Sequence, residues 1–224
     1  MNAIIYYSNT NESLNIAKYI GDKENLPLYD INTLKEYTFD FLYLIFPIHY
    51  QSIPKEIIPS IKKIKANRAI VIATYGKMSF GHVLYDIKKI LKAKIIAGAY
   101  IPAKHTYLLK DKPFNDYNKL DSIIQLKSRT EEIQFPKTKK NIFSNFLPRF
   151  RHQISVKIIK NKNCNQCNRC NLICKNINKG KPNNQCIRCL KCINSCPNRA
   201  LEFKLSPIMN NYLKKERVNQ FIVY

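Results

Sequence analysis

A repeated cysteine pattern constrains this chain more than any other feature of its sequence. All eight cysteines lie between residues 164 and 196, and the first 163 residues contain none. They form two copies of the spacing C-x2-C-x2-C-x3-C, offset by 22 residues, and the second copy ends in Cys196-Pro197. Two-residue gaps allow consecutive thiolates to converge on one metal centre. The segment therefore predicts a small fold organised around metal ligands.

The spacing predicts two [4Fe-4S] clusters whose fourth ligands are exchanged between the copies. In this pattern the last cysteine, displaced by three residues and often followed by proline, ligates the cluster of the other copy. The expected ligands are Cys164, Cys167, Cys170 and Cys196 for the first cluster, and Cys186, Cys189, Cys192 and Cys174 for the second. The exchange requires both copies to fold together.

Structural zinc is the alternative use of these cysteines. Zinc sites usually contain histidine or two C-x2-C pairs held apart by a longer loop, and neither occurs in this block. The segment resembles a bacterial-type two-[4Fe-4S] ferredoxin domain over about 45 residues. It departs from that pattern at Lys175, which stands where proline would follow Cys174, but the change removes no ligand.

Disulfide bonds would be a third use, and the N-terminus disfavours them. Residues 1–6 enter a strand-like run directly, without the charged segment and cleavage site of an export signal. The longest apolar run, Phe41 to Ile48, contains a proline and is far shorter than the ~18 to 20 residues needed to cross a bilayer. We therefore expect a cytoplasmic protein, in which closely spaced cysteines more often bind metal than pair with each other.

The first 136 residues predict an α/β domain. Short runs rich in β-branched and aromatic residues alternate with helical patterns, and two of these runs are apolar throughout, as is typical of parallel strands covered on both faces. The expected strands are Ala3 to Tyr7, Leu26 to Ile31, Phe39 to Phe46, Ala69 to Ala73 and Lys94 to Tyr100; the expected helices are Glu12 to Ile20, Pro54 to Ile64, His82 to Leu91 and Tyr117 to Ile133. Five strands in this alternation predict a doubly wound, flavodoxin-like parallel sheet with strand order 2-1-3-4-5.

Three further segments follow this domain. Residues 137–155 are basic and aperiodic and are interpreted as a linker; residues 156–205 hold the cysteine repeat in a small α+β domain; residues 206–224 form a tail. The tail contains a short helical pattern and an apolar end, Phe221 to Tyr224, which we expect to pack back on a domain.

The loop after the first strand is a candidate phosphate site. At the carboxyl edge of an α/β sheet, loop amides and a helix N-terminus bind phosphate. The loop offers Ser8, Asn9, Thr10, Asn11 and Ser13, and it resembles the FMN phosphate loop of flavodoxins. Asn9 and Asn11 replace the usual glycines, and Glu12 adds a negative charge near the expected phosphate. The alternative is an ordinary helix N-cap.

Two more loops lie at the carboxyl ends of the strands beside the first. One contains Pro47, His49 and Tyr50, and the other contains Thr74, Tyr75 and Gly76. Either tyrosine, or His49, could stack on the isoalloxazine ring, and the backbone near Gly76 could face its pyrimidine side. Each aromatic residue alone also fits an ordinary loop residue, so the prediction of FMN depends on the three loops together.

The domain order resembles a family of prokaryotic flavodoxin-ferredoxin fusion proteins. The resemblance implies an electron-transfer protein with FMN and two [4Fe-4S] clusters, which passes single electrons to a redox partner. The alternative is a flavin-dependent reductase that acts on a small molecule and receives electrons from the clusters.

The charge distribution bears on the partner. The chain has 38 Lys and Arg against 15 Asp and Glu, and residues 151–200 have 11 basic and no acidic side chains. A nucleic-acid partner is disfavoured, because the excess is local and the chain is rich in Lys, Asn and Ile throughout. An acidic redox protein is the expected partner, since opposite charges accelerate encounter.

Overall fold

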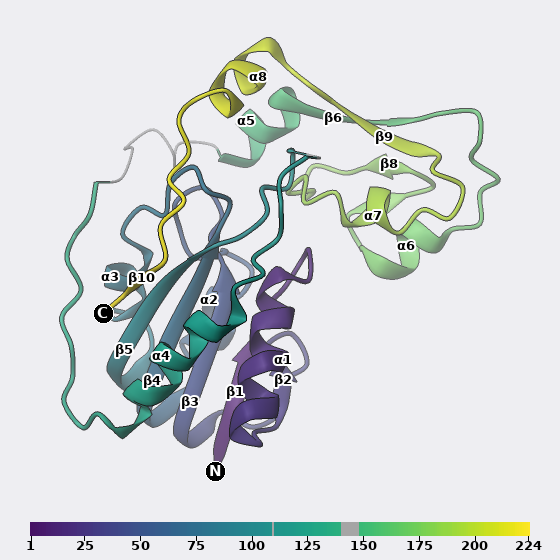
Figure 1. Ribbon diagram of the computed structural model, residues 1–224. Coiled ribbons are helices and arrows are strands. Elements are labelled where there is room, and N and C mark those ends of the chain that lie inside the picture. Colours follow the sequence, from purple (N-terminus) through teal and green to yellow (C-terminus); the bar gives the residue numbers. More distant parts are fainter. Residues whose placement is uncertain (109, 140–147) are drawn as a thin grey trace. The chain divides into compact units, whose positions relative to one another are not determined.

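A computed structural model describes residues 1–108, 110–139 and 148–224 and divides the chain into two compact units (Figure 1). The first, here called the sheet unit, comprises Met1–Ser144 and Arg217–Tyr224. The second, here called the cysteine unit, comprises Asn145–Glu216. The cysteine unit is therefore inserted into the chain of the sheet unit, because the last eight residues return to the latter.

The sheet unit is built on one six-stranded sheet. Its strands are β1 (Asn2–Tyr6), β2 (Leu28–Asp30), β3 (Thr38–Pro47), β4 (Lys65–Tyr75), β5 (Lys92–Pro102) and β10 (Ile222–Val223), in the order β10-β5-β4-β3-β1-β2. The first five are parallel, and β10 runs antiparallel to β5. The five predicted strands and their order 2-1-3-4-5 are confirmed, and this order is flavodoxin-like.

Both faces of the sheet are covered, as the apolar strands predict. Alternate residues of β3 enter two separate cores: Leu42 and Leu44 belong to one, and Tyr43 and Ile45 to the other. Helix α1 (Glu12–Glu24), η1 (Tyr117–Leu120) and α4 (Asp121–Ile124) contribute to the second core. Helices α2 (Ile58–Ile61) and α3 (Val83–Ile87) contribute to the first. The fold is thus a helix–sheet–helix sandwich (Figure 1).

Three of the four predicted helices are shorter than their patterns suggest. The helix expected from Pro54 to Ile64 is reduced to α2, because Pro59 is accepted only in a first helical turn. The helix expected from His82 to Leu91 is reduced to α3. The helix expected from Tyr117 to Ile133 is divided into η1, α4 and η2 (Gln125–Ser128), and it ends where Arg129 adopts an extended backbone.

The cysteine unit contains two small antiparallel pairs and four helices. Strands β6 (Val156–Lys160) and β9 (Leu201–Leu205) pair with each other, and β7 (Ile177–Asn178) pairs with β8 (Lys181–Pro182). The helices are α5 (Pro148–Ser155), α6 (Arg169–Ile173), α7 (Lys191–Asn194) and α8 (Pro207–Leu213). Part of the expected linker, residues 148–155, is therefore helical, and residues 140–147 lie outside the described residues.

The tail is divided between the units. Residues 206–216 belong to the cysteine unit, whereas Arg217–Tyr224 form a C-terminal strap on the sheet unit. Tyr224 N–H donates to the carbonyl of Gly98 on β5 at 2.8 Å, and Gly98 N–H donates back to Tyr224 at 3.3 Å. Over the described residues, we find no helix with both the length and the apolar character of a membrane span.

Candidate functional site

The first predicted ligand group lines one pocket. Cys164, Cys167, Cys170 and Cys196, here called the first cysteine set, border a space of about 380 Å³ that is partly open to solvent. Cys164 and Cys167 lie on the turn that leads into α6, Cys170 lies on α6, and Cys196 follows α7. The amide of Ala200 donates to Cys196 Sγ at 3.3 Å, which fixes this sulfur from the opposite side of the pocket. The exchanged fourth cysteine thus lies with the partners that the spacing predicts for it.

The second predicted group, Cys174, Cys186, Cys189 and Cys192, is here called the second cysteine set; Cys186 and Cys192 are buried, and Cys174 and Cys189 are partly buried. Burial, together with the negative charges of Cys189, Cys186 and Cys174, raises the pKa of Cys192 to about 12. Burial also raises the pKa of Cys189, and the negative charges of Cys174 and Cys186 raise it as well. A hydrogen bond from the Lys191 amide lowers this pKa. The charge of Cys174 thus acts on two cysteines of the other copy.

The backbone around both sets repeats one unusual conformation. Gln166 and Asn168 have φ of 60° and 58°, and their equivalents 22 residues later, Arg188 and Leu190, have φ of 59° and 61°. Left-handed backbone is rare for bulky residues, because Cβ approaches the carbonyl oxygen. Its occurrence twice in each C-x2-C-x2-C turn means that both copies bend their chain in the same way around the sulfur atoms.

The surroundings of the sulfur atoms are apolar and shared. Ile177, Cys192 and Leu201 form the buried core of this region, and partly buried residues pack against it: Ile158, Cys170, Ile173, Cys174, Ile193 and Cys196. Within the residues that the structure describes, no three His, Cys, Asp or Glu side chains converge closely enough to hold a single metal ion. Two sets of four thiols in apolar surroundings fit a thiolate-ligated cluster of several irons.

In the sheet unit, the candidate phosphate loop leads into α1. Asn11 precedes the helix with φ of 67°, a left-handed conformation that asparagine tolerates well. The Ser13 and Thr74 hydroxyl groups are buried and lie 3.0 Å apart, in a hydrogen bond that joins this loop to the end of β4. Ser8 and Thr10 are only partly buried. Ser13 and Thr74 thus hold the loop in place.

Glu12 does not act as an isolated charge next to this loop. Burial raises its pKa, whereas hydrogen bonds from the Phe114 and Lys104 amides, and the positive charges of Lys77 and Lys104, lower it. The Phe114 amide donates to Glu12 Oε2 at 3.3 Å. The carboxylate therefore connects the start of α1 to the segment after β5.

His49 lies in a polar group at the carboxyl ends of β1 and β3. Its Nε2 is 3.3 Å from Asn9 Nδ2, and its Nδ1 is 3.5 Å from Glu56 Oε1. The Tyr7 hydroxyl donates to the same Glu56 oxygen at 2.8 Å. Burial raises the pKa of Glu56, but His49 and Tyr7 outweigh it, and the pKa falls to about 2. Tyr50 follows with φ of 54°, and Pro47 ends β3 partly buried.

The third predicted loop differs from the other two because its tyrosine is buried in the core. Tyr75 is buried, and its hydroxyl donates to the Gln220 carbonyl at 2.7 Å and accepts from the Gln220 amide at 2.9 Å. Its ring belongs to the core on one face of the sheet. Gly76 lies against His105, because a Cβ at this glycine would be 2.7 Å from His105 Cδ2. Tyr75 thus anchors the C-terminal strap.

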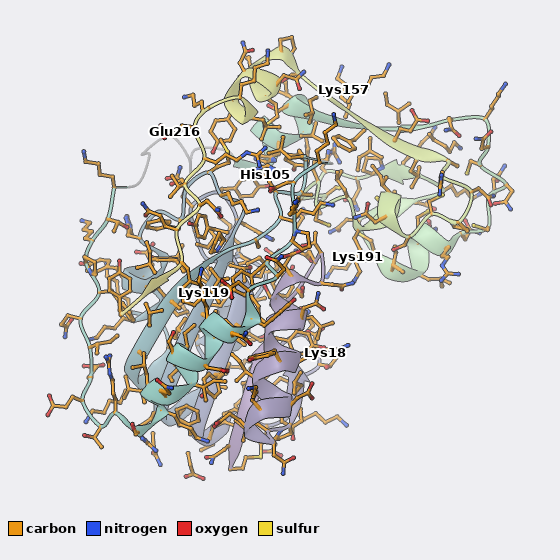
Figure 2. All side chains as sticks on the ribbon, in the orientation of Figure 1. Lys18, His105, Lys119, Lys157, Lys191 and Glu216 are labelled. Carbon is orange, nitrogen blue, oxygen red and sulfur yellow. The ribbon has the colours of Figure 1, made fainter. Side chains whose placement is uncertain are left out.

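A charged group next to Gly76 was not predicted from the sequence. The buried Asp111 carboxylate accepts from Lys77 Nζ at 3.0 Å, Arg217 Nη1 at 3.0 Å and the His105 amide at 2.7 Å. The pKa of His105 is lowered to about 4, mainly by burial. The negative charge of Asp111 raises this pKa, and the positive charge of Arg217 lowers it. His105 follows β5 and is labelled in Figure 2. No motif connects these four residues, which are far apart in the chain.

Comparisons with known proteins add little to this description. No protein-family model matches the sequence, and no curated protein matches it. Solved structures that resemble it include two named "putative flavoprotein", from Bacteroides uniformis (16% identity, 55% of this chain and 97% of that chain, TM-score 0.40) and Bacteroides eggerthii (16%, 58% and 98%, 0.39). A third is the Trp repressor binding protein of Bacillus subtilis (13%, 58% and 99%, 0.35). Scores this low identify neither a family nor a ligand, so the fold assignment depends on the strand order.

Proposed function

We propose that this protein is an electron carrier that holds two [4Fe-4S] clusters in the cysteine unit and FMN at the carboxyl edge of the sheet. The observation that carries the proposal is the position of Cys196, the last cysteine of the second copy, beside three cysteines of the first copy. Cys196 lines the pocket of the first cysteine set, and Cys174 acts on the pKa values of the second. Such clusters transfer single electrons, and a flavin exchanges one or two.

The residues of the cysteine unit would serve this role in three ways. The thiolates would ligate iron, the apolar side chains around Ile177 and Leu201 would exclude water, and the basic side chains would offset the cluster charge. Residues 151–200 carry +11. Two clusters at about −2 each would leave this segment near +7. Among the described residues of this 72-residue unit, eight apolar side chains are buried, two of them cysteines, and domains below about 80 residues usually need cross-links or metal.

The flavin part of the proposal depends on fewer residues than the sequence suggests. Ser8, Thr10 and the amides that begin α1 would hold the phosphate. Tyr50 would contact the ring. Ser13 and Thr74 pair with each other and would support the loop, and Tyr75 is used by the strap. The hydrogen bonds to Glu12 reduce the repulsion that its charge would otherwise exert on a phosphate.

The experiment that tests the proposal is anaerobic purification followed by iron, sulfide and flavin analysis. We expect about eight irons and eight sulfides per chain, as two [4Fe-4S] clusters require, and one FMN. Iron without flavin would retain the carrier but remove the FMN site. Zinc without sulfide would contradict the proposal.

Two matched double variants test the exchange of ligands. Cys174→Ser/Cys192→Ser removes two ligands of the second cysteine set, so about four irons should remain. Cys170→Ser/Cys174→Ser removes one ligand from each set, so both clusters should be lost or made labile. Equal iron retention by the two variants would contradict the exchanged arrangement.

A second candidate function is a flavin-dependent reductase of a small molecule. The group of Asn9, His49 and Glu56 favours it, because a histidine held by a carboxylate can deliver a proton during reduction. Anaerobic turnover of a small-molecule acceptor that is lost in His49→Gln, while the cofactor content stays unchanged, would support this function over a simple carrier.

A further inference from the structure

The two cysteine sets differ in their access to solvent. Cys167 of the first set is exposed, and Cys164 and Cys170 are partly buried. At the equivalent positions of the second set, Cys186 and Cys192 are buried. The two copies have the same spacing and the same backbone bend, so the difference comes from the residues around them.

The intervening residues show the same difference. Gln166 and Asn168 are exposed, whereas their equivalents, Arg188 and Leu190, are buried. Arg188 Nε donates to the Val156 carbonyl at 3.0 Å, which closes the second copy against β6. The first cysteine set is therefore more exposed than the second, in which Cys174 and Cys189 are partly buried and Cys186 and Cys192 are buried.

Leu172 of the first copy is apolar and nevertheless exposed. It lies on α6, two residues after Cys170, and is 85% exposed, the highest value among the exposed large apolar side chains of the described residues. Its equivalent in the second copy is Asn194, an exposed polar residue. A leucine held in water next to a pocket of cysteines has no role in the core of this chain.

Two basic residues lie on or next to α6, the helix that carries this leucine. Arg169 and Lys179 are exposed and line the pocket of the first cysteine set. The Lys179 amide donates to Asn171 Oδ1 at 3.0 Å, which holds the β7–β8 turn against α6. We call the surface formed by Cys167, Arg169, Leu172 and Lys179 the α6 face.

We propose that the α6 face is the docking surface for an acidic redox protein and that electrons are exchanged through the first cysteine set. This inference rests on the proposed function. In each encounter one electron leaves the partner and enters this protein, or the reverse, and no bond is made or broken. Leu172 would supply the apolar contact, and Arg169 and Lys179 would attract and orient the partner.

Charge indicates that the occupant is a separate, acidic protein. The cysteine unit contains 15 basic and 2 acidic side chains, a net charge of +13. The sheet unit contains the remaining 23 basic and 13 acidic side chains, a net charge of +10. Two units of the same sign repel each other at long range, so neither supplies the opposite charge that the α6 face would attract.

The probe for the test is a small, reduced, acidic two-[4Fe-4S] ferredoxin, mixed anaerobically with the oxidised holoprotein in a stopped-flow instrument. For Arg169→Glu/Lys179→Glu we expect the second-order rate constant at low ionic strength to fall about tenfold, because attraction becomes repulsion. The difference should shrink in high salt. Lys157→Glu/Lys204→Glu makes the same charge change on the β6–β9 pair and should alter the rate less than about twofold. Equal losses in both pairs would overturn the proposal.

Leu172→Asn tests the apolar contact by introducing the residue found in the second copy. We expect a rate several-fold lower at both low and high salt, because burial of an apolar side chain is not screened by ions. Ile208→Asn, at an 80% exposed residue of α8, is the matched control and should leave the rate unchanged. If Leu172→Asn reacts at the parent rate, or if it slows only the electron exchange between the two units, the surface does not dock a separate partner.

Two measurements separate the failure of this proposal from failure of the proposed function. Iron and sulfide content and reduction by dithionite are determined for the parent and every variant. A parent without clusters would end both proposals. Clusters that dithionite reduces normally, combined with ferredoxin rates that are indifferent to the α6 face, would end this proposal alone.

Discussion

Two buried tyrosines differ in what their hydroxyl groups contact. Tyr43 on β3 has a buried hydroxyl without a hydrogen-bond partner among the described residues, and burial raises its pKa. Tyr100 on β5 is buried to a similar degree, but its hydroxyl accepts from the Leu84 amide at 2.9 Å. A buried polar group without a partner is destabilising, whereas one with a partner is close to neutral.

Tyr43→Phe should therefore raise the free energy of unfolding by about 1 kcal/mol, because it removes a polar atom without removing a hydrogen bond. Tyr100→Phe is the matched comparison and should lower it by ~1 to 2 kcal/mol, since the Leu84 amide loses its acceptor. Urea unfolding followed by circular dichroism measures both. A destabilising Tyr43→Phe would show that this hydroxyl has a favourable contact in solution.

His105 should make stability depend on pH. Its pKa is about 4 in the folded chain and ~6.5 when unfolded. The unfolded state therefore binds more protons between these values, so stability present above pH 6.5 is lost as the pH falls toward 4. Between pH 7 and pH 5 the loss from this group should be about 2 kcal/mol. His105→Asn retains an acceptor for the Tyr107 amide and should lose most of this dependence; an unchanged pH profile would contradict the assignment.

Among single residues, the spacing of the cysteines is more informative than the aromatic residues. Identical spacing in two copies leaves few arrangements for eight thiols, and Cys196 lines a pocket with Cys164, Cys167 and Cys170, as expected; the grouping of Cys174 with the second copy stays a prediction. Tyr75 was expected to face a ring, yet it is buried beneath the strap. Its partner Gln220 lies 145 residues away, and no local pattern reports such a contact.

The C-terminal strap protects the edge of the sheet. The Val218 amide donates to the Lys77 carbonyl at 2.8 Å, Gln220 pairs with the Tyr75 hydroxyl, and β10 pairs with β5. An unpaired edge strand is open to association with other chains. The strap thus covers the free edge of β5. Its eight residues begin directly after the inserted cysteine unit.

Tyr75→Phe should loosen this strap without unfolding the sheet. It removes both hydrogen bonds to Gln220, so the Gln220 amide should exchange with solvent about fivefold faster, as the loss of a bond worth roughly 1 kcal/mol allows. Amides in the centre of β3 and β4 serve as the internal control and should exchange as before. Unchanged exchange at Gln220 would mean that β10 alone holds the strap.

At the scale of elements, strands were easier to predict than helices. A central parallel strand is apolar on both faces, and this composition is visible in β3 and β4 without knowledge of their neighbours. The lengths of α2 and α3 depend on Pro59 and on the packing of each short helix against the sheet. β10 has only two residues, and its pairing with β5 requires the chain to return after the whole cysteine unit.

The two units differ in what holds them together. The sheet unit has two cores with many fully buried side chains, including Leu44 and Ile70. Among the described residues, the cluster around the cysteines has three buried members, one of which is Cys192 itself, and five more apolar residues of the unit are buried: Val156, Cys186, Leu190, Ala200 and Leu213. Apolar burial scales with stability at about 25 cal/mol per Å². The sheet unit therefore has the means to remain folded without cofactors, whereas under the proposed function the cysteine unit would depend on its clusters.

Removal of iron should consequently unfold one unit and spare the other. After anaerobic treatment with an iron chelator, amides of β6 and β9 should lose protection from hydrogen exchange, because the iron–sulfur bonds that would join the two copies are broken. Amides of β3 and β4 in the same sample should stay protected, since their cores contain no cysteine. Reconstitution with iron and sulfide should restore protection to β6 and β9. Loss of protection in all four strands would show that the units unfold as one, and full protection of β6 and β9 without iron would show that the cysteine unit is held by its apolar core alone.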